Sequence, residues 1–170
     1  MRTLLVMRHA KSSWANAHQA DHDRPLNERG ERDAPRMGRW LAAHDLAPDV
    51  ILCSSAARAH DTALAVAAET TADAPIVRPA LYGGDVDAYI AALRRLDDGA
   101  AIALIVGHNP TVSMLVADLA DLADLADVDA AMPTAAVAWL ELPIDRWSDL
   151  TDEVDAALKA LWRPREVDAG

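Results

Sequence analysis

The sequence begins MRTLLVMRHAKSSW (residues 1–14), and its apolar run ends abruptly on Arg8 and His9. Residues 4–7, LLVM, show no polar alternation, which is typical of a strand buried on both faces of a sheet. No polar turn separates this run from the arginine and the histidine. The stretch therefore predicts a buried strand that delivers both side chains to its tip.

Two further apolar runs, VILC at 50–53 and IALIV at 102–106, have the same character as residues 4–7. Helical patterns lie between and after these runs, because apolar residues recur there at intervals of three and four. These residues are Met37, Trp40 and Leu41; Leu64, Ala67 and Ala68; Tyr89, Ile90, Leu93 and Leu96; and Val112, Leu115, Val116 and Leu119. The alternation predicts a three-layer α/β/α fold, in which helices cover both faces of a central, mostly parallel sheet.

Proline, glycine and capping residues set the expected boundaries of the first half. Pro35 lacks a backbone N–H, so we expect residues 26–32 to form a separate turn. The first helix should then start at Asp33, a good N-cap, and end near Asp45. Further along, the prolines and glycines around residues 76–82 predict a short strand followed by a loop.

The last third of the chain is less regular. The stretch TAAVAWLEL at 134–142 predicts a strand, whereas residues 151–162 fit either a strand or a helix. The repeat DLADLADLADVD at 118–129 places leucine at every third position, which drifts around a helix. We expect this repeat to be the end of a helix that runs into a surface loop, rather than a metal site, since it lacks the glycine and final glutamate of a calcium loop.

Length, charge and cysteine content narrow the class of protein. The 170 residues fit one domain, 1–170, that can bury its own core. A formal net charge of −11 at pH 7 disfavours binding to nucleic acids and to anionic membrane surfaces. The single cysteine, Cys53, cannot form an internal disulfide, and the first apolar run is too short for a signal peptide or a membrane span. We therefore expect a cytoplasmic protein with neither a nucleic-acid nor a membrane partner.

Basic side chains follow all three predicted strands. Arg8 and His9 follow the first, Arg58 comes shortly after the second, and His108 follows the third within GHNP at 107–110. The carboxyl ends of neighbouring parallel strands meet at one edge of a sheet, so these groups can converge. Helix N-termini at the same edge favour an anion. The pattern predicts a phosphate pocket in an otherwise acidic protein.

Four motifs carry a resemblance to a known family. They are R-H-A at 8–10, R-P-L-N-E-R-G at 24–30, S-S-A-A-R-A-H-D-T-A at 54–63, and G-H-N-P at 107–110. In this order the sequence resembles the histidine phosphatase superfamily, and most of all its SixA-type phosphohistidine phosphatases, over roughly residues 1–142. Ala10 and Ala15 stand where the mutase branch usually has glycine and asparagine, which favours the phosphatase branch. The resemblance implies a phosphoglycerate mutase-like fold, a phosphorylated histidine intermediate, and neither a metal nor a cofactor.

The resemblance also implies roles for individual residues. His9 would be the nucleophile, and Arg8, Arg58 and His108 would hold the phosphoryl oxygens. These roles agree with the chemistry, because histidine attacks phosphorus only as neutral imidazole, and nearby cations disfavour its charged form. No glutamate occupies the general-acid position clearly. Asp21 is the first candidate for this acid, and Asp85 is the second.

A cysteine nucleophile and a histidine metal site are two other kinds of site that the sequence suggests. Cys53 could act as the nucleophile of a cysteine phosphatase, but only four residues separate it from Arg58, and no glycine lies between them. We expect Cys53 to lie in a buried strand instead. His18 and His22 are four apart, as on a metal-binding helix, yet the surrounding HQADHD is typical of a polar loop.

The sequence favours a phosphatase that hydrolyses a phosphoryl group through His9, with a phosphohistidine-bearing protein as substrate. Imidazole is a good leaving group, with a pKa of about 6.5, and needs little help from an acid, whereas an alkoxide needs protonation. We therefore expect faster turnover of phosphohistidine than of sugar or glycerate phosphates. The alternatives are a phosphatase for small phosphate esters and a module that binds phosphorylated groups without catalysis.

Overall fold

The computed structural model describes residues 1–120 and 132–167, and this part of the chain contains a six-stranded sheet with the order β3-β2-β4-β1-β5-β6. The strands are β1 (Arg2–Arg8), β2 (Val50–Cys53), β3 (Ile76–Val77), β4 (Ile102–Gly107), β5 (Val137–Leu142) and β6 (Ala157–Trp162). The helices are α1 (Glu28–Ala43), α2 (Ala57–Thr70), α3 (Val86–Leu93) and α4 (Thr111–Leu119). Short 3₁₀ turns lie at Asp21–Asp23, Pro79–Leu81 and Trp147–Asp149.

The sheet is mostly parallel, as the sequence predicts. β1 pairs with β4, β4 with β2, and β2 with β3, all in parallel, whereas β5 and β6 form an antiparallel edge. Parallel strands need crossovers, and the helices supply them between successive strands. The α/β fold is therefore confirmed, and β1, β4 and β2 end side by side at one edge.

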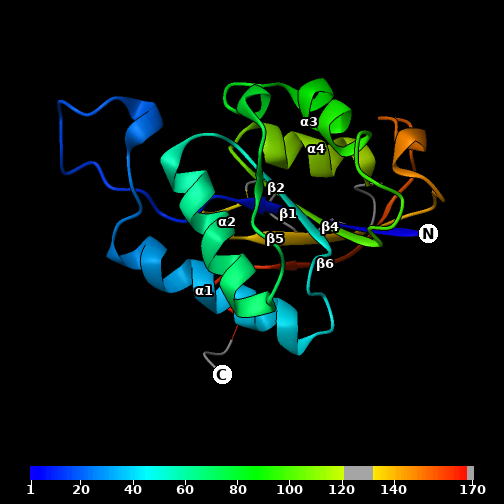
Figure 1. Cartoon of the computed structure of the whole chain (residues 1–170), viewed down its shortest axis with the longest axis horizontal. Helices are drawn as coiled ribbons and strands as arrows, with labels where there is room; N and C mark the ends of the chain where they lie inside the picture. Colours follow the sequence, from blue (N-terminus) through cyan, green and yellow to red (C-terminus); the bar gives the residue numbers. More distant parts are fainter. Residues whose placement is uncertain (121–131, 168–170) are drawn as a thin grey trace.

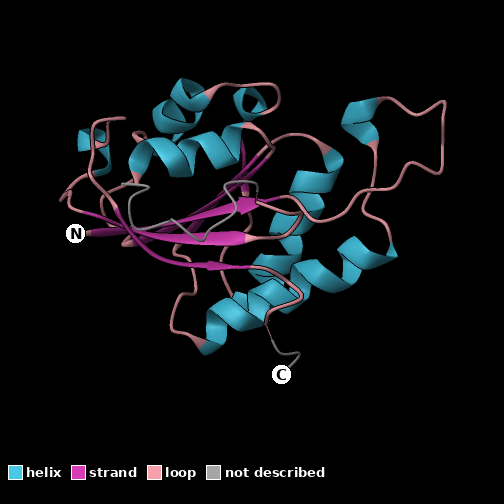
Figure 2. Cartoon of the chain, turned by 180° about the vertical axis from the view of Figure 1, so that it is seen from behind, coloured by secondary structure: helices cyan, strands magenta, loops and turns pink. Residues whose placement is uncertain are grey.

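Helices cover both faces of the sheet (Figure 1, and from behind in Figure 2). Alternate residues of β1 face opposite layers: Leu4 and Val6 pack in the core with α3 and α4, and Leu5 and Met7 pack with α1 and α2. All four side chains are fully buried, which explains why the run lacks polar alternation. In the described ranges, none of the helices has the length and apolar character needed to cross a membrane.

The predicted start of the first helix is wrong. α1 begins at Glu28 rather than after Asp33, so residues 28–32 are helical and Pro35 lies inside the helix. Asn27 is the N-cap, because its side chain accepts a hydrogen bond from the backbone N–H of Gly30 at 2.9 Å. Burial of the apolar face of α1 against the sheet offsets the one backbone hydrogen bond that Pro35 removes.

The remaining boundaries agree with the sequence pattern in most places. Residues 76–82 contain the short strand β3 and a 3₁₀ turn, and the strand predicted within 134–142 is β5. The ambiguous stretch 151–162 ends in a strand, β6, whose partner is β5. The leucine repeat at 118–129 lies mostly outside the described residues, and its first two residues end α4.

Candidate active site

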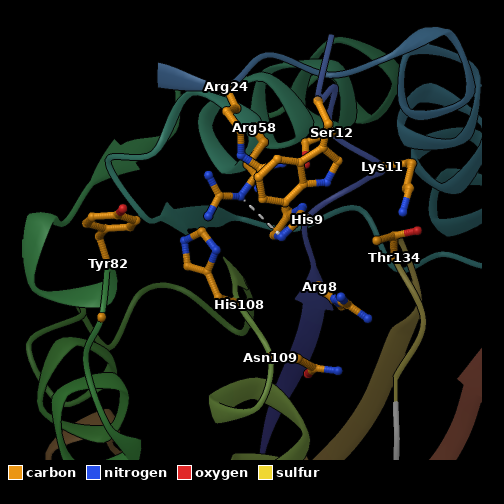
Figure 3. A pocket seen from close by; sticks show the side chains of 12 residues that line it. Arg8, His9, Lys11, Ser12, Arg24, Arg58, Tyr82, His108, Asn109 and Thr134 are labelled. Atoms are coloured by element: carbon orange, nitrogen blue, oxygen red, sulfur yellow. Dashed lines mark hydrogen bonds between the residues drawn. The ribbon is translucent and has the colours of Figure 1, made fainter. Parts of the chain in front are cut away.

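The register of the sheet places three strand ends next to one another. Arg8 pairs with Gly107 between β1 and β4, and Cys53 pairs with Val106 between β2 and β4. His9, Ser54 and His108 therefore follow at the same edge. Arg58 reaches this edge from the first turn of α2, and its guanidinium points toward His9 and His108 (Figure 3). The structure thus brings together the four basic residues that the sequence singled out.

These four residues line one cavity of about 370 Å³. The other lining residues come from the loop after β1, the segment between the 3₁₀ turn Pro79–Leu81 and α3, and the segments that follow β4 and precede β5. The full lining is Arg8, His9, Lys11, Ser12, Trp14, Arg24, Arg58, Tyr82, Gly83, His108, Asn109 and Thr134. Within this lining, arginine, lysine and histidine are the only ionisable groups besides the phenol of Tyr82, so the cavity is suited to an anion.

His9 is held rigidly and is 8% exposed. Its backbone N–H donates to the carbonyl of Gly107 at 2.9 Å, and its ring Nδ1 lies 2.7 Å from the carbonyl oxygen of Ala10. A carbonyl oxygen only accepts, so the ring proton resides on Nδ1 and the lone pair resides on Nε2. Nε2 lies 3.4 Å from Nε of Arg58 (Figure 3). The nitrogen that faces the cavity's cations is therefore the one able to act as a nucleophile.

The surroundings of His9 keep its imidazole neutral. Burial is the largest cause, and together with the charges of His108, Arg58 and Arg8 it lowers the pKa of His9 to about 3, against the opposing hydrogen bond to Ala10. A group with this pKa carries almost no proton on Nε2 at neutral pH. The site thus maintains the protonation state that nucleophilic attack requires.

Asp21 fixes the position of Arg58. Two nitrogens of the guanidinium donate to Asp21, NH1 to its backbone oxygen at 2.7 Å and NH2 to its carboxylate at 3.1 Å. The same carboxylate accepts from Tyr82 at 2.8 Å and from Arg24 at 3.1 Å. The hydrogen bond from Tyr82 and the charge of Arg58 lower the pKa of Asp21 to about 2. The carboxyl group is therefore ionised at neutral pH.

Arg8 brings a positive charge that no carboxylate neutralises among the described residues. Its NH1 donates to the carbonyl oxygen of Met132 at 3.0 Å, and within the same ranges its buried Nε has no acceptor. Burial lowers the pKa of Arg8 from its usual value. An anion in the cavity would supply the negative partner that this guanidinium lacks.

His108 is positioned by neighbours from two other segments. Its Nε2 lies 2.8 Å from the hydroxyl oxygen of Ser54, and its backbone N–H donates to the hydroxyl of Tyr89 at 3.2 Å. The approach of Tyr89 requires glycine at position 107, because a Cβ there would lie 2.1 Å from the tyrosine oxygen. Burial, reinforced by the charge of Arg58, lowers the pKa of His108 to about 4. Its ring centroid lies 5.1 Å from that of His9.

Several residues that line the cavity were not predicted from the sequence. Arg24 is 6% exposed and lies within the motif R-P-L-N-E-R-G, which could have indicated it as a further cation. The same motif supports the loop after His9: a Cβ on Gly30 would lie 2.1 Å from the carbonyl oxygen of Lys11. Trp14 and Tyr82 have no such motif signal, because they reach the cavity through the path of their loops.

The residues of the alternative assignments lie outside the cavity lining or have other structural roles. Asp85 caps α3 by accepting from the backbone N–H of Ala88 at 3.1 Å, and it does not line the cavity. Cys53 is buried in β2, and burial raises the pKa of its thiol to about 11, which disfavours a thiolate nucleophile. His22 contacts Ser55 and Asp23 through its two ring nitrogens. Across residues 1–120 and 132–167, no group of three or more His, Cys, Asp or Glu side chains could hold a metal ion.

Comparison with known proteins agrees with this arrangement. Residues 4–82 match the family model of the histidine phosphatase superfamily, branch 1. The uncharacterized protein Rv1276c of Mycobacterium tuberculosis is 39% identical over 153 residues, which cover 85% of this chain and 91% of the relative. A protein from Nakamurella multipartitia, assigned as a phosphohistidine phosphatase SixA, superposes with a TM-score of 0.79 at 34% identity over 96% of both chains. The protein histidine phosphatase SixA in complex with tungstate superposes with a TM-score of 0.77 at 26% identity, covering 96% of this chain and 97% of that one.

Proposed function

This chain belongs to the histidine phosphatase superfamily, and we propose that it is a phosphatase that transfers a phosphoryl group first to His9 and then to water. One observation carries the proposal. His9 is a neutral imidazole whose Nδ1 is engaged by the carbonyl of Ala10, so its Nε2 presents a lone pair toward Arg58 in a cationic cavity. A group that only bound phosphate would gain more from a charged imidazolium.

In the first step, the lone pair of Nε2 attacks phosphorus, and the bond between phosphorus and the leaving group breaks. Arg8, Arg58 and His108 surround the position that the phosphoryl oxygens would occupy, and the two guanidiniums spread the charge that the oxygens carry in the transition state. Asp21 keeps Arg58 in place before substrate arrives, so little reorganisation is needed. The product of this step is a phosphohistidine on the enzyme.

In the second step, a water molecule attacks the same phosphorus from the side that the leaving group has vacated. The bond between phosphorus and Nε2 breaks, and inorganic phosphate leaves with the oxygen and one proton of the water, while the other proton passes to the solvent. The electron pair of that bond returns to Nε2, which restores neutral His9. Burial and the neighbouring cations favour this neutral product over an imidazolium.

We propose protein phosphohistidine as the substrate, rather than a small phosphate ester. The SixA protein of Nakamurella multipartitia is named a phosphohistidine phosphatase, and the SixA bound to tungstate is named a protein histidine phosphatase, which supports the choice. The charge state of Asp21 supports it as well, because a carboxyl with a pKa of about 2 has no proton to give an alkoxide at neutral pH. Asp21 could donate a proton only if bound substrate displaced Tyr82 and the two arginines, whose hydrogen bonds and charge lower this pKa. Its contacts support a role in holding Arg58.

The experiment that tests this function is a trapping assay. The protein is incubated with a ³²P-phosphohistidine protein and, separately, with labelled phosphoserine and 3-phosphoglycerate. We expect rapid release of phosphate from phosphohistidine, slower release from the two esters, and label on the enzyme that is stable to alkali and labile to acid. His9→Ala should abolish both release and label. Tight binding of phosphohistidine without release or label would identify a binding module instead, and equal rates on all three substrates would contradict the choice of phosphohistidine.

A further inference from the structure

An exposed tryptophan stands at the mouth of the cavity. Trp14 is 72% exposed, although aromatic residues make up only 4% of the chain. It lines the same cavity as His9, Arg58 and His108. An indole that is exposed at the entrance of a cationic pocket contributes little to the stability of the core. Its position therefore suggests a role in binding a ligand.

Trp14 is held in place despite its exposure. One face of the indole lies over the guanidinium of Arg24, with 3.5 Å between Cζ and the ring centroid. Arg24 is itself fixed, because its Nε donates to the carboxylate of Asp21 at 3.1 Å. The backbone beside Trp14 is also anchored: the N–H of Ser13 donates to the carbonyl of Pro25 at 2.8 Å, and Ser12 forms a β-bridge with Leu26. The indole is therefore a preorganised surface.

The chemistry of the cavity divides between its floor and its mouth. The basic side chains around His9 suit the phosphoryl group, whereas the aromatic rings of Trp14 and Tyr82 suit what is attached to it. Tyr82 is 37% exposed, and its ring centroid lies 5.7 Å from that of His108. Both rings line the same cavity, so a group attached to phosphorus there can contact them. Flat rings stack well on an indole face, whereas polyhydroxylated or carboxylated chains would lose hydration there.

We propose that Trp14 determines the leaving-group specificity of this enzyme by stacking its free indole face on a planar ring, the imidazole of a phosphohistidine residue. The proposal rests on the proposed function and names the group that selects the substrate class. The contact with Arg24 supports it, because the buried guanidinium covers one face of the indole, while the tryptophan as a whole stays largely exposed to a ligand in the cavity. Stacking adds affinity only for substrates whose leaving group is a ring.

The test uses two phosphonates that cannot be hydrolysed, so that it does not depend on turnover. Phenylphosphonate carries a planar ring, and methylphosphonate carries none. Dissociation constants are measured by calorimetry for the unmutated protein, Trp14→Ala, Trp14→Phe and the control Leu64→Ala, which removes an exposed apolar side chain outside the cavity lining. Circular dichroism of each variant shows whether the fold is retained.

We expect the unmutated protein to bind phenylphosphonate about tenfold more tightly than methylphosphonate, as one aromatic stacking contact allows. Trp14→Ala should reduce this preference to less than about twofold without weakening methylphosphonate, and Trp14→Phe should keep most of it. Leu64→Ala should change neither value. Equal weakening of both ligands in Trp14→Ala would show that the indole acts only by supporting Arg24, and no weakening of either would show that it does not contact the ring. Both outcomes overturn the proposal. If Trp14→Ala loses the preference for phenylphosphonate but the trapping assay gives no labelled enzyme, the role of Trp14 is supported. That pair of results would contradict only the proposed function.

Discussion

Two regions of the molecule build the same cavity in different ways. The ends of β1, β2 and β4 deliver His9, Ser54 and His108 through the backbone register of the sheet. The loop between β1 and α1 brings Trp14 and Arg24 to the cavity lining through contacts among its own side chains, and its Asp21 binds the distant Arg58. The strand ends are thus fixed by the core, whereas the loop is fixed by a small number of polar contacts. We expect changes at the strand ends to abolish the chemistry and changes in the loop to tune it.

The largest effect should come from removing the nucleophile at the end of β1. His9→Ala eliminates Nε2, so we expect phosphohistidine hydrolysis to fall by at least about 10³-fold, and no phosphoenzyme to form. Release of labelled phosphate measures the rate. The control is His60→Ala, which lies within the same motif as Arg58 but outside the cavity lining. Retained activity in His9→Ala would assign the nucleophile to another residue.

Arg58 belongs to both regions, because it follows β2 and is held by Asp21 from the loop. Arg58→Ala removes a charged donor from the transition state, and we expect kcat/KM to fall by about 10²–10³-fold. Steady-state kinetics measure the loss. Arg39→Ala, which removes an exposed pair with Glu69, should leave kcat/KM unchanged. A similar loss of kcat/KM in both variants would mean that the total positive charge of the protein matters, rather than a contact between Arg58 and the phosphoryl group.

The strand-end region can also be perturbed through packing alone. Gly107→Ala would force a methyl group against the hydroxyl of Tyr89, so we expect the free energy of unfolding to fall by about 1–3 kcal/mol. Urea denaturation measures the change. The double variant Gly107→Ala, Tyr89→Leu removes both the hydroxyl and the ring carbons that the methyl meets, so it should lose less stability than the two single variants combined. If the double variant loses as much as the two single variants combined, the contact with the Tyr89 ring is not the cause.

A smaller effect is expected in the loop. Asp21→Asn keeps a hydrogen-bond acceptor for Arg58 but removes the negative charge, and we expect kcat/KM to fall by about tenfold. The pattern across substrates separates two roles. A residue that positions Arg58 gives the same loss for phosphohistidine and for 3-phosphoglycerate, whereas a proton donor gives a larger loss for the ester. Asp23→Asn, in the same 3₁₀ turn, is the control and should leave kcat/KM unchanged for both substrates.

The smallest expected effect is the response of the His9 and His108 rings to pH, which should be close to zero near neutral pH. Burial lowers the pKa of His9 to about 3 and that of His108 to about 4, so both rings should stay neutral where an ordinary histidine gains its proton, near pH 6.5. We expect their NMR ring-proton shifts to stay constant from about pH 7.5 to about pH 5.5. The same depressed values mean that the unfolded chain binds more protons below about pH 6.5, so stability should decline as the pH falls. A midpoint near 6.5 for either ring would contradict the buried, neutral site.

Prediction from the sequence succeeded where the signal was local. The strands at residues 4–7, 50–53 and 102–106 lack polar alternation because both faces of the sheet are covered, and a basic residue of the site follows each run within five residues. It was wrong for the start of α1, where Pro35 suggested a boundary. The capping contact of Asn27 and the burial of the helix face outweighed that one missing hydrogen bond.

The sequence by itself determined the α/β alternation and the order of Arg8, His9, Arg58 and His108, because short apolar runs and adjacent motifs encode them. Only the tertiary structure decided which nitrogen of His9 presents its lone pair to Arg58, and that Asp21 holds Arg58 and Tyr82 across 37 and 61 residues of chain. It also placed Trp14 on Arg24 at the mouth of the cavity. These features depend on burial and on the exact path of the backbone at the strand end and in the loop, which no local pattern of residues specifies.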